Sequence, residues 1–255
     1  MTKPTTLITG TAMFTKFAAA LTLGLALCAP LHASEGGAAL QSANVSLNDT
    51  AALQRGAKLY FNYCAGCHSL RYVRYSRIAE DLQIDPKDVE ANLIFTGAKI
   101  GDLAINNLSA EDGTKWFGKA PPDLSLEGRS KGADWIYSYL KSFYLDPTRP
   151  LGWNNTVFEN ASMPNVLWEL QGVQSAVRKG GAADGPIERL DLTTPGRQSA
   201  EEFDRSVRDI TAFLQYVGEP AALKRESMGV WVLLYLAVFT LLAYLLKREF
   251  WKDVH

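Results

Sequence analysis

The sequence predicts a mainly α-helical protein made of one exported globular domain and one C-terminal transmembrane helix. Three observations support this prediction: an apolar leader, apolar residues at helical spacing in the domain, and a long uncharged apolar run near the C-terminus. We expect a signal peptide at residues 1–33, the domain at 34–223, a juxtamembrane linker at 224–227, the transmembrane helix at 228–246 and a tail at 247–255.

The N-terminal leader has the layout of a secretory signal peptide. Lys3 and Lys16 precede an apolar and small-residue run over residues 17–31, and the simplest cleavage follows Ala33. An uncleaved anchor is the alternative, although the run is short for a full membrane span. Cleavage would also remove Cys28, the one cysteine outside the central motif, so we expect no structural disulfide.

The domain is organised around the sequence CAGCH at residues 64–68. A Cys-x-x-Cys-His motif is the signature of covalent haem attachment. Cysteines three residues apart on one helical turn project to the same side, so both thiols can bond one edge of a porphyrin. The imidazole of His68 can then ligate the iron. We therefore predict one haem c, bound covalently through Cys64 and Cys67.

A zinc half-site, a thiol redox pair and a chance match are the alternatives at this motif. Zinc needs four ligands, but the expected mature chain has no second Cys/His pair, because His32 lies in the leader and His255 is the last residue. A thioredoxin-like pair follows a strand in a βαβ pattern, whereas a helical pattern precedes these cysteines. The inventory of residues therefore favours haem.

Elimination points to Met163 as the second axial ligand. Met1 and Met13 belong to the leader and Met228 opens the apolar C-terminal run, so Met163 is the methionine left in the domain. It lies in residues 145–165, a stretch rich in Pro, Gly and Asn that we expect to be a long loop. A haem held by His and Met moves single electrons and offers no vacancy to a substrate. An open sixth position, as in a haem enzyme or a gas sensor, is the competing hypothesis.

The sequence APPDLS at residues 120–125 predicts a rigid turn, because each proline fixes its own φ. A proline carbonyl in this turn, that of Pro122, is a candidate to accept the Nδ1 proton of His68 and so fix its tautomer. A simple turn at the entry to a helix explains the prolines equally well.

Three helices are expected around these motifs. Asn48 or Asp49 can cap a helix that runs into the CAGCH motif. Asp134 is expected to cap a helix over residues 135–144 with an aromatic face. The capping box at residues 199–202 begins a third helix, whose apolar face we expect to pack across the first.

The rest of the domain is less regular. Residues 69–75 form a basic and aromatic run that we expect along the haem edge, with its arginines available to the propionates. Residues 78–118 are predicted to be an insertion of short helices and loops. Residues 175–179 and 187–191 flank a glycine-rich turn, which predicts a hairpin.

The domain is also acidic. Residues 34–223 carry 24 acidic against 19 basic side chains, before any haem propionates are added. This balance does not suit a nucleic-acid ligand, which basic surfaces bind. It suits a basic soluble partner, although a surface that only confers solubility explains the charge equally well.

The apolar run at residues 228–246 is long enough to cross a membrane. Its 19 residues carry no charge and span about 28 Å as a helix, close to the thickness of the bilayer core. Basic residues on both sides do not decide its orientation. The signal peptide does, since it exports the domain and leaves the tail at 247–255 in the cytoplasm.

Several segments of the chain resemble one family. These are CAGCHSLRYVRY at residues 64–75, APPDLS at 120–125, MPNVLWEL at 163–170 and WKDVH at 251–255. All four are similar to segments of the cytochrome c1 family, the haem c subunits of cytochrome bc1 complexes. The similarity runs in order from about residue 51 to the C-terminus and is closest to proteobacterial members.

The resemblance implies a cytochrome c-like haem domain with insertions of loops and short helices. It also implies the two thioether cysteines and the two axial ligands named above. In the family a basic residue shortly after the Pro-Pro turn contacts a haem propionate, which here is Arg129 or Lys131. Asn165 departs slightly from the histidine or proline that the family often has after its Met-Pro pair.

The resemblance further implies a function and partners. Electrons from quinol would pass through the Rieske iron–sulfur protein to this haem and then to a soluble cytochrome c. The anchor would pack against cytochrome b in a dimeric complex of the bacterial inner membrane, with the haem domain in the periplasm. The chain would then be an electron-relay subunit of a quinol–cytochrome c reductase, without a substrate site of its own. A free-standing, membrane-anchored cytochrome c that serves another oxidase is the alternative.

Overall fold

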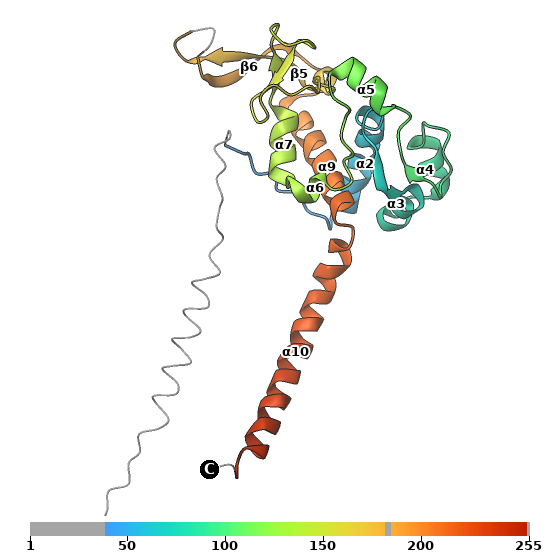
Figure 1. Ribbon diagram of the computed structural model, residues 1–255, viewed down its shortest axis with the longest axis vertical. Helices are drawn as coiled ribbons and strands as arrows, with labels where there is room; N and C mark the ends of the chain where they lie inside the picture. The colour runs from blue at the N-terminus through green and yellow to red at the C-terminus, as the bar shows by residue number, and fades with distance from the viewer. Residues whose placement is uncertain (1–38, 182–184, 254–255) are drawn as a thin grey trace, which may run out of the picture. The chain divides into compact units, whose positions relative to one another are not determined.

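The computed structural model describes residues 39–181 and 185–253 (Figure 1). The expected signal peptide at residues 1–33, with Cys28 and His32, lies outside the described residues, and so does His255. Cleavage after Ala33 therefore stays a prediction.

Helix α2 (Thr50–Tyr63) leads directly into the CAGCH motif. The Asp49 carboxylate accepts a hydrogen bond from the Ala52 N–H at 3.0 Å, which satisfies one of the free donors at the start of the helix. Cys64 occupies the C-cap position. The predicted cap at Asp49 and the predicted place of the first cysteine are both confirmed.

Helix α9 (Ala200–Gly218) packs beside α2 at the centre of the domain (Figure 1). Its capping box is present, with Ser199 and Glu202 each accepting a hydrogen bond from the backbone of the other. The two helices approach closely because Gly56 has no side chain: a Cβ there would lie 2.0 Å from the Asp209 carbonyl oxygen. The buried residues of the pair include Leu53, Tyr60, Phe61, Val207, Ile210 and Phe213.

Helices α6 (Glu127–Ser130) and α7 (Ala133–Lys141) also contact α9. The predicted cap at Asp134 is wrong, because α7 begins after Gly132 and Asp134 lies in its first turn. The Asp134 carboxylate instead accepts a hydrogen bond from the Ala43 N–H at 2.7 Å and so holds the N-terminal segment. The helix is also shorter than predicted, since it ends before the strand that starts at Phe143.

The insertion predicted at residues 78–118 does consist of short elements. They are the end of α3 (Tyr75–Leu82), α4 (Pro86–Asn92), β2 (Leu103–Ala104) and α5 (Ala110–Phe117). The preceding basic and aromatic run contains a strand, β1 (Leu70–Arg74), that pairs antiparallel with β2. Its arginines point outward: the Arg71 side chain is 66% exposed, and Arg74 donates to the Gly101 carbonyl at 2.6 Å.

A four-stranded sheet follows α7, in the order β4-β3-β5-β6. Its strands are β3 (Phe143–Leu145), β4 (Trp153–Asn155), β5 (Gly172–Arg178) and β6 (Ile187–Pro195), with α8 (Trp168–Gln171) before β5 and the 3-10 turn η1 (Lys179–Gly181) after it. β5 and β6 form the predicted hairpin, longer than expected. The stretch predicted as a loop, residues 145–165, contains β4 and is therefore only partly irregular.

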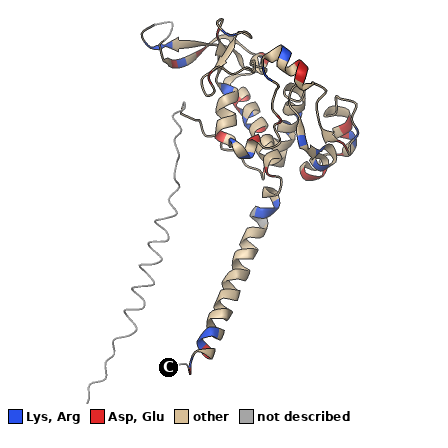
Figure 2. Ribbon diagram, in the orientation of Figure 1, with Lys and Arg blue, Asp and Glu red and all other residues tan. Residues whose placement is uncertain are grey.

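The C-terminal helix α10 (Ala222–Phe250) contains the candidate membrane span Met228–Phe250. None of the span is buried by the rest of the described chain, and the charged residues of α10 lie at the two ends of that helix (Figure 2). A long apolar helix without protein cover is suited to lipid, where every backbone group is satisfied inside the helix. The predicted linker at 224–227 belongs to the same helix. The predicted fold class, mainly α with one C-terminal membrane helix, is confirmed.

Candidate haem site

The two cysteines lie on a tight turn at the C-terminal end of α2. The Cys64 N–H continues the helical pattern by donating to the Tyr60 carbonyl at 2.8 Å. The N–H groups of Cys67 and His68 then both donate to the Cys64 carbonyl, at 3.0 and 2.9 Å. Both thiols are free. One turn of backbone therefore holds two thiols and one imidazole in a fixed local arrangement.

The surroundings of the thiols do not suit a redox pair. Burial raises the pKa of the Cys64 thiol to about 12, with a smaller contribution from Cys67, and burial also raises the pKa of Cys67. A reactive thiol pair needs the opposite shift, since the thiolate is the nucleophile. Zinc is also disfavoured, because no group of three or more His, Cys, Asp or Glu side chains gathers anywhere in residues 39–181 and 185–253.

The imidazole of His68 is buried and held from one side. Its Nδ1 lies 2.7 Å from the Pro122 carbonyl oxygen, and a carbonyl can only accept. Nδ1 must therefore carry the proton, which leaves the lone pair of Nε2 for a metal. Burial lowers the pKa of His68, outweighing the opposing influence of the Pro122 carbonyl and of Asp123 and Glu127. The neutral imidazole, the form that ligates metals, is thus favoured.

Further hydrogen bonds hold the Pro122 turn against the motif. The Leu124 N–H donates to the Ser69 carbonyl at 3.0 Å, and the Asp123 carboxylate accepts from the Arg71 N–H at 2.9 Å. These contacts surround the His68–Pro122 bond. The position of the imidazole is thus set by two segments that are 54 residues apart in the chain.

Two supporting residues were not predicted from the sequence. The Tyr60 hydroxyl donates to the His68 carbonyl at 2.7 Å in the buried core. Asp123 binds the strand after the motif, as described above. The sequence held a signal for each residue. Tyr60 lies one helical turn before Cys64, and Asp123 directly follows Pro122, a turn position where aspartate side chains commonly hydrogen-bond to nearby backbone.

Met163 lies between β4 and α8 and is partly buried. Its side chain packs against the buried core that includes Cys64. Two hydrogen bonds of Asn165 fix the loop that carries Met163. The Asn165 Oδ1 accepts from the Leu167 N–H at 3.0 Å, and the Asn165 Nδ2 donates to Gln171 Oε1 at 3.1 Å. A thioether on a pinned, core-facing loop is a suitable donor for haem iron.

The two candidate propionate ligands have other partners. Arg129 Nη1 lies 3.0 Å from Glu219 Oε1, at the end of α9. Lys131 Nζ lies 5.3 Å from the centre of the Trp135 ring, in a cation–π contact. Among the described residues, no hydrogen bond or ion pair joins either side chain to the CAGCH motif.

The donor set as a whole fits haem c. It offers two free thiols on one turn, a buried imidazole with Nε2 available, and a thioether on a core-facing loop. Together with one candidate membrane helix, these features fit the class of membrane-anchored c-type cytochromes.

Comparison with known proteins gives the family. Residues 41–112 and 102–254 match the Cytochrome C1 family. The chain is 53% identical over 228 residues to a protein named cytochrome c1 from Allochromatium vinosum, covering 88% of this chain and 93% of that one. It is 26% identical over 257 residues to cytochrome c1 of Rhodospirillum rubrum, covering 90% and 94%. The chain belongs to the cytochrome c1 family and is of proteobacterial type, which confirms the resemblance.

A further relative carries a different name. The chain is 41% identical over 224 residues to a Nitrosomonas europaea protein named ammonia monooxygenase gamma subunit, covering 88% of this chain and 92% of that one. Membership of the cytochrome c1 family implies a haem c cofactor and supports an electron-transfer subunit of a bc1-type complex. With its candidate span, the chain is a single-pass, membrane-anchored protein.

Proposed function

We propose that this chain passes single electrons from the Rieske iron–sulfur protein to a soluble cytochrome c, as the haem c subunit of a cytochrome bc1 complex during quinol oxidation. The observation that carries the proposal is the hydrogen bond from His68 Nδ1 to the Pro122 carbonyl, beside two free thiols. It leaves one imidazole nitrogen for iron where the thiols would tether a porphyrin.

Each residue of the site has a separate role in this proposal. Cys64 and Cys67 would tether one haem, since an S–H can add across each vinyl group without a leaving group. His68 Nε2 and Met163 Sδ would ligate its iron, and the Pro122 carbonyl fixes the tautomer of His68. The haem supplies an iron that takes up and releases one electron. With both of these residues bound to the iron, the haem would offer no vacancy to a substrate.

Arg129 is the better candidate for a propionate contact. The Arg129 side chain is 64% exposed, and its carboxylate partner Glu219 also pairs with Arg225. Glu219 therefore keeps a cationic partner when Arg129 turns towards a propionate. Lys131 would have to give up its contact with the Trp135 ring.

The proposed location is the bacterial inner membrane. The leader at residues 1–33 is cleaved after Ala33 and exports the domain to the periplasm, and the tail at 247–255 stays in the cytoplasm. The uncovered apolar surface of α10 supports packing against other membrane helices, which we assign to cytochrome b. The excess of acidic side chains over residues 34–223 supports a basic electron acceptor.

Purification of the tagged full-length chain from native membranes in mild detergent tests the proposal. We expect haem b and a Rieske centre to co-purify with the haem c. A haem c protein that migrates alone would contradict the assignment and support a free-standing electron carrier.

A second function follows from the relative named ammonia monooxygenase gamma subunit, which is 41% identical to this chain. That name suggests that this chain is a subunit of a monooxygenase. The same purification separates the two functions, since a co-purifying monooxygenase without haem b would favour the second.

A further inference from the structure

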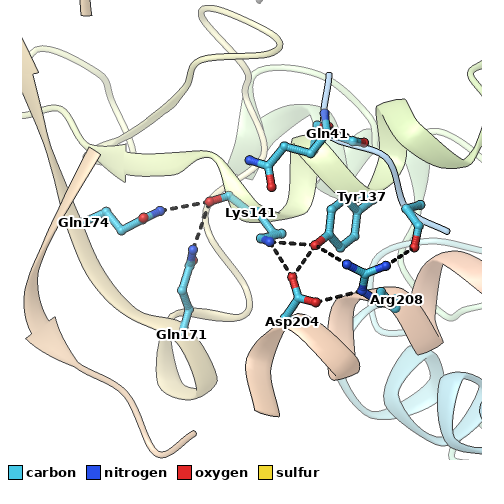
Figure 3. Close-up of polar contacts among 9 residues, drawn as sticks. Gln41, Tyr137, Lys141, Gln171, Gln174, Asp204 and Arg208 are labelled. Atoms are coloured by element: carbon cyan, nitrogen blue, oxygen red, sulfur yellow. Dashed lines mark hydrogen bonds and ion pairs between the residues drawn. The ribbon is translucent and has the colours of Figure 1, made fainter. Parts of the chain in front are cut away.

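One side chain, Gln171 at the end of α8, ties the Met163 loop to α7. Its Nε2 donates to the Lys141 carbonyl at 3.0 Å, and its Oε1 accepts from Asn165 Nδ2 at 3.1 Å. Asn165 follows Met163 by two residues and is 2% exposed. Gln171 therefore bridges the methionine loop and the C-terminal end of α7, where Figure 3 shows it pointing at Lys141.

The chemistry of the partners fixes the orientation of both amides. The Lys141 carbonyl can only accept, so the nitrogen of Gln171 faces it and the oxygen of Gln171 faces Asn165. Asn165 uses its own oxygen to accept from the Leu167 N–H at 3.0 Å, which leaves its nitrogen for Gln171. The polar atoms of the bridge have complementary partners in a part-buried setting, and such networks are costly to break.

A network of charged side chains anchors the other end of the bridge. Lys141 Nζ lies 2.5 Å from Asp204 Oδ1 and 2.7 Å from the Tyr137 hydroxyl (Figure 3). Asp204 also accepts from Arg208 Nε at 2.7 Å. Asp204 and Arg208 belong to α9, which packs on α2. A continuous path of contacts thus runs from the helix before the CAGCH motif to the methionine loop.

We propose that Gln171 is a positioning residue for Met163, an inference that rests on the proposed role of Met163 as axial ligand. The Met163 side chain itself packs by apolar contacts, which have no preferred direction. The Gln171 bridge adds directional hydrogen bonds two residues away. Without the bridge, the loop that carries Met163 keeps its apolar packing but is no longer held at a fixed distance from α7. The bond from the Met163 sulfur to the iron would then break more often.

Two leucine variants of the full-length protein in native membranes separate positioning from general structure. Gln171→Leu removes both hydrogen bonds of the bridge and keeps a similar size. Gln174→Leu is the matched control, because Gln174 Nε2 donates to the same Lys141 carbonyl at 3.0 Å and to the Phe143 carbonyl at 2.9 Å. It removes a bond to α7 without touching Asn165.

The readouts are the methionine–iron charge-transfer band of the oxidised haem and the rate at which carbon monoxide binds the reduced haem. For Gln171→Leu we expect a weaker band and a rate about ten-fold higher, which corresponds to about 1.4 kcal/mol, the size expected for the loss of two part-buried hydrogen bonds. For Gln174→Leu we expect a band and a rate close to those of the wild type.

Equal changes in the two variants, or none in Gln171→Leu, would overturn the positioning role. If Gln171→Leu does not accumulate with haem, Gln171→Asn replaces it, since its side chain is one methylene too short to span both partners. A faster rate in Gln171→Asn supports the role, and a wild-type rate contradicts it. Failure of the underlying assignment looks different: the wild type itself would lack the band and bind carbon monoxide as fast as Met163→Ala, which overturns both proposals.

Discussion

The two proposed ligand regions of this protein are built in different ways. On one side, the turn at residues 64–68 carries both thiols and the imidazole within one helical turn, and the Pro122 carbonyl holds His68 directly at 2.7 Å. On the other side, Met163 lies on a loop that is held through the bridge from Asn165 to Gln171. The comparison teaches that backbone groups fix the histidine side, both in its own turn and in the Pro122 turn, whereas the methionine side depends on the side-chain amides of Asn165 and Gln171.

Among the variants that separate the two ligand regions, removal of the Met163 side chain should have the largest effect on the haem. We expect Met163→Ala to leave the haem attached, because the cysteines and His68 are untouched, but to convert it to a high-spin or ligand-exchanged form with a lowered midpoint potential. Reduced Met163→Ala should bind carbon monoxide almost completely. Absorption spectroscopy and redox titration measure these changes, and an unchanged spectrum would refute Met163 as the ligand.

On the histidine side, we expect the largest loss of stability from a change in the packing of α2 against α9. Gly56→Val places a side chain against the Asp209 backbone, where even a Cβ would lie 2.0 Å from the carbonyl oxygen. We expect a loss of about 2 kcal/mol in the free energy of unfolding, or about 4–8 °C in the melting temperature of the detergent-solubilised protein. Gly66→Ala is the control, because nothing lies within 4 Å of its added Cβ. Equal melting temperatures for the two variants would show that the α2–α9 contact can relax.

Acid should weaken the network that anchors the methionine side. Burial alone would raise the pKa of Asp204, but hydrogen bonds from Lys141, Tyr137 and Arg208 hold that pKa well below its ordinary value. The ionised Asp204 therefore stabilises the fold above about pH 4, and this contribution is lost as the pH falls through the lowered pKa.

Asp204→Asn removes this pH dependence. We expect it to cost about 1–2 kcal/mol at pH 7, where the loss leaves Lys141 and Arg208 without their shared carboxylate, and clearly less at pH 3. Chemical denaturation at the two pH values measures the difference. A cost that is the same at both would show that the charge of Asp204 does not matter.

The smallest effect is expected from the candidate propionate ligands. Arg129→Gln should shift the midpoint potential of the haem modestly downward, because a positive charge near the iron favours the reduced form. Lys131→Gln, whose cation lies over the Trp135 ring, should shift it less. If neither variant moves the potential, both residues lose their proposed role.

Local patterns explain what the sequence could predict about the fold. The Asp49 cap, the capping box at Ser199, the β5–β6 hairpin and the span in α10 each depend on neighbouring residues, and all are present. Strand β1 could not be predicted, because it pairs with a distant partner, Leu70 with Ala104, and β3 likewise pairs with the distant β5. Strands β3 and β4 are three residues each, too short to show an alternating pattern. The predicted helix cap at Asp134 was wrong because its carboxylate has a distant partner as well, since it accepts a hydrogen bond from the Ala43 N–H.

The same division holds for the candidate site. The spacing of Cys64, Cys67 and His68 is local and predicts a haem from the sequence alone. A hydrogen bond from His68 to the Pro122 carbonyl was one of two explanations for the rigid turn. Met163 was found by elimination, together with its place in a stretch rich in Pro, Gly and Asn. The bridge through Gln171 left no signal, because its partner Lys141 lies 30 residues away. Iron ligation by these residues stays a prediction.

Addition of carbon monoxide to the reduced native protein at neutral pH tests the central claim most directly. If His68 and Met163 fill both axial positions of a haem c that only relays electrons, the absorption bands of that haem should not change. A rapid shift of the bands to those of a carbon monoxide complex would show an open sixth position and contradict the proposed function.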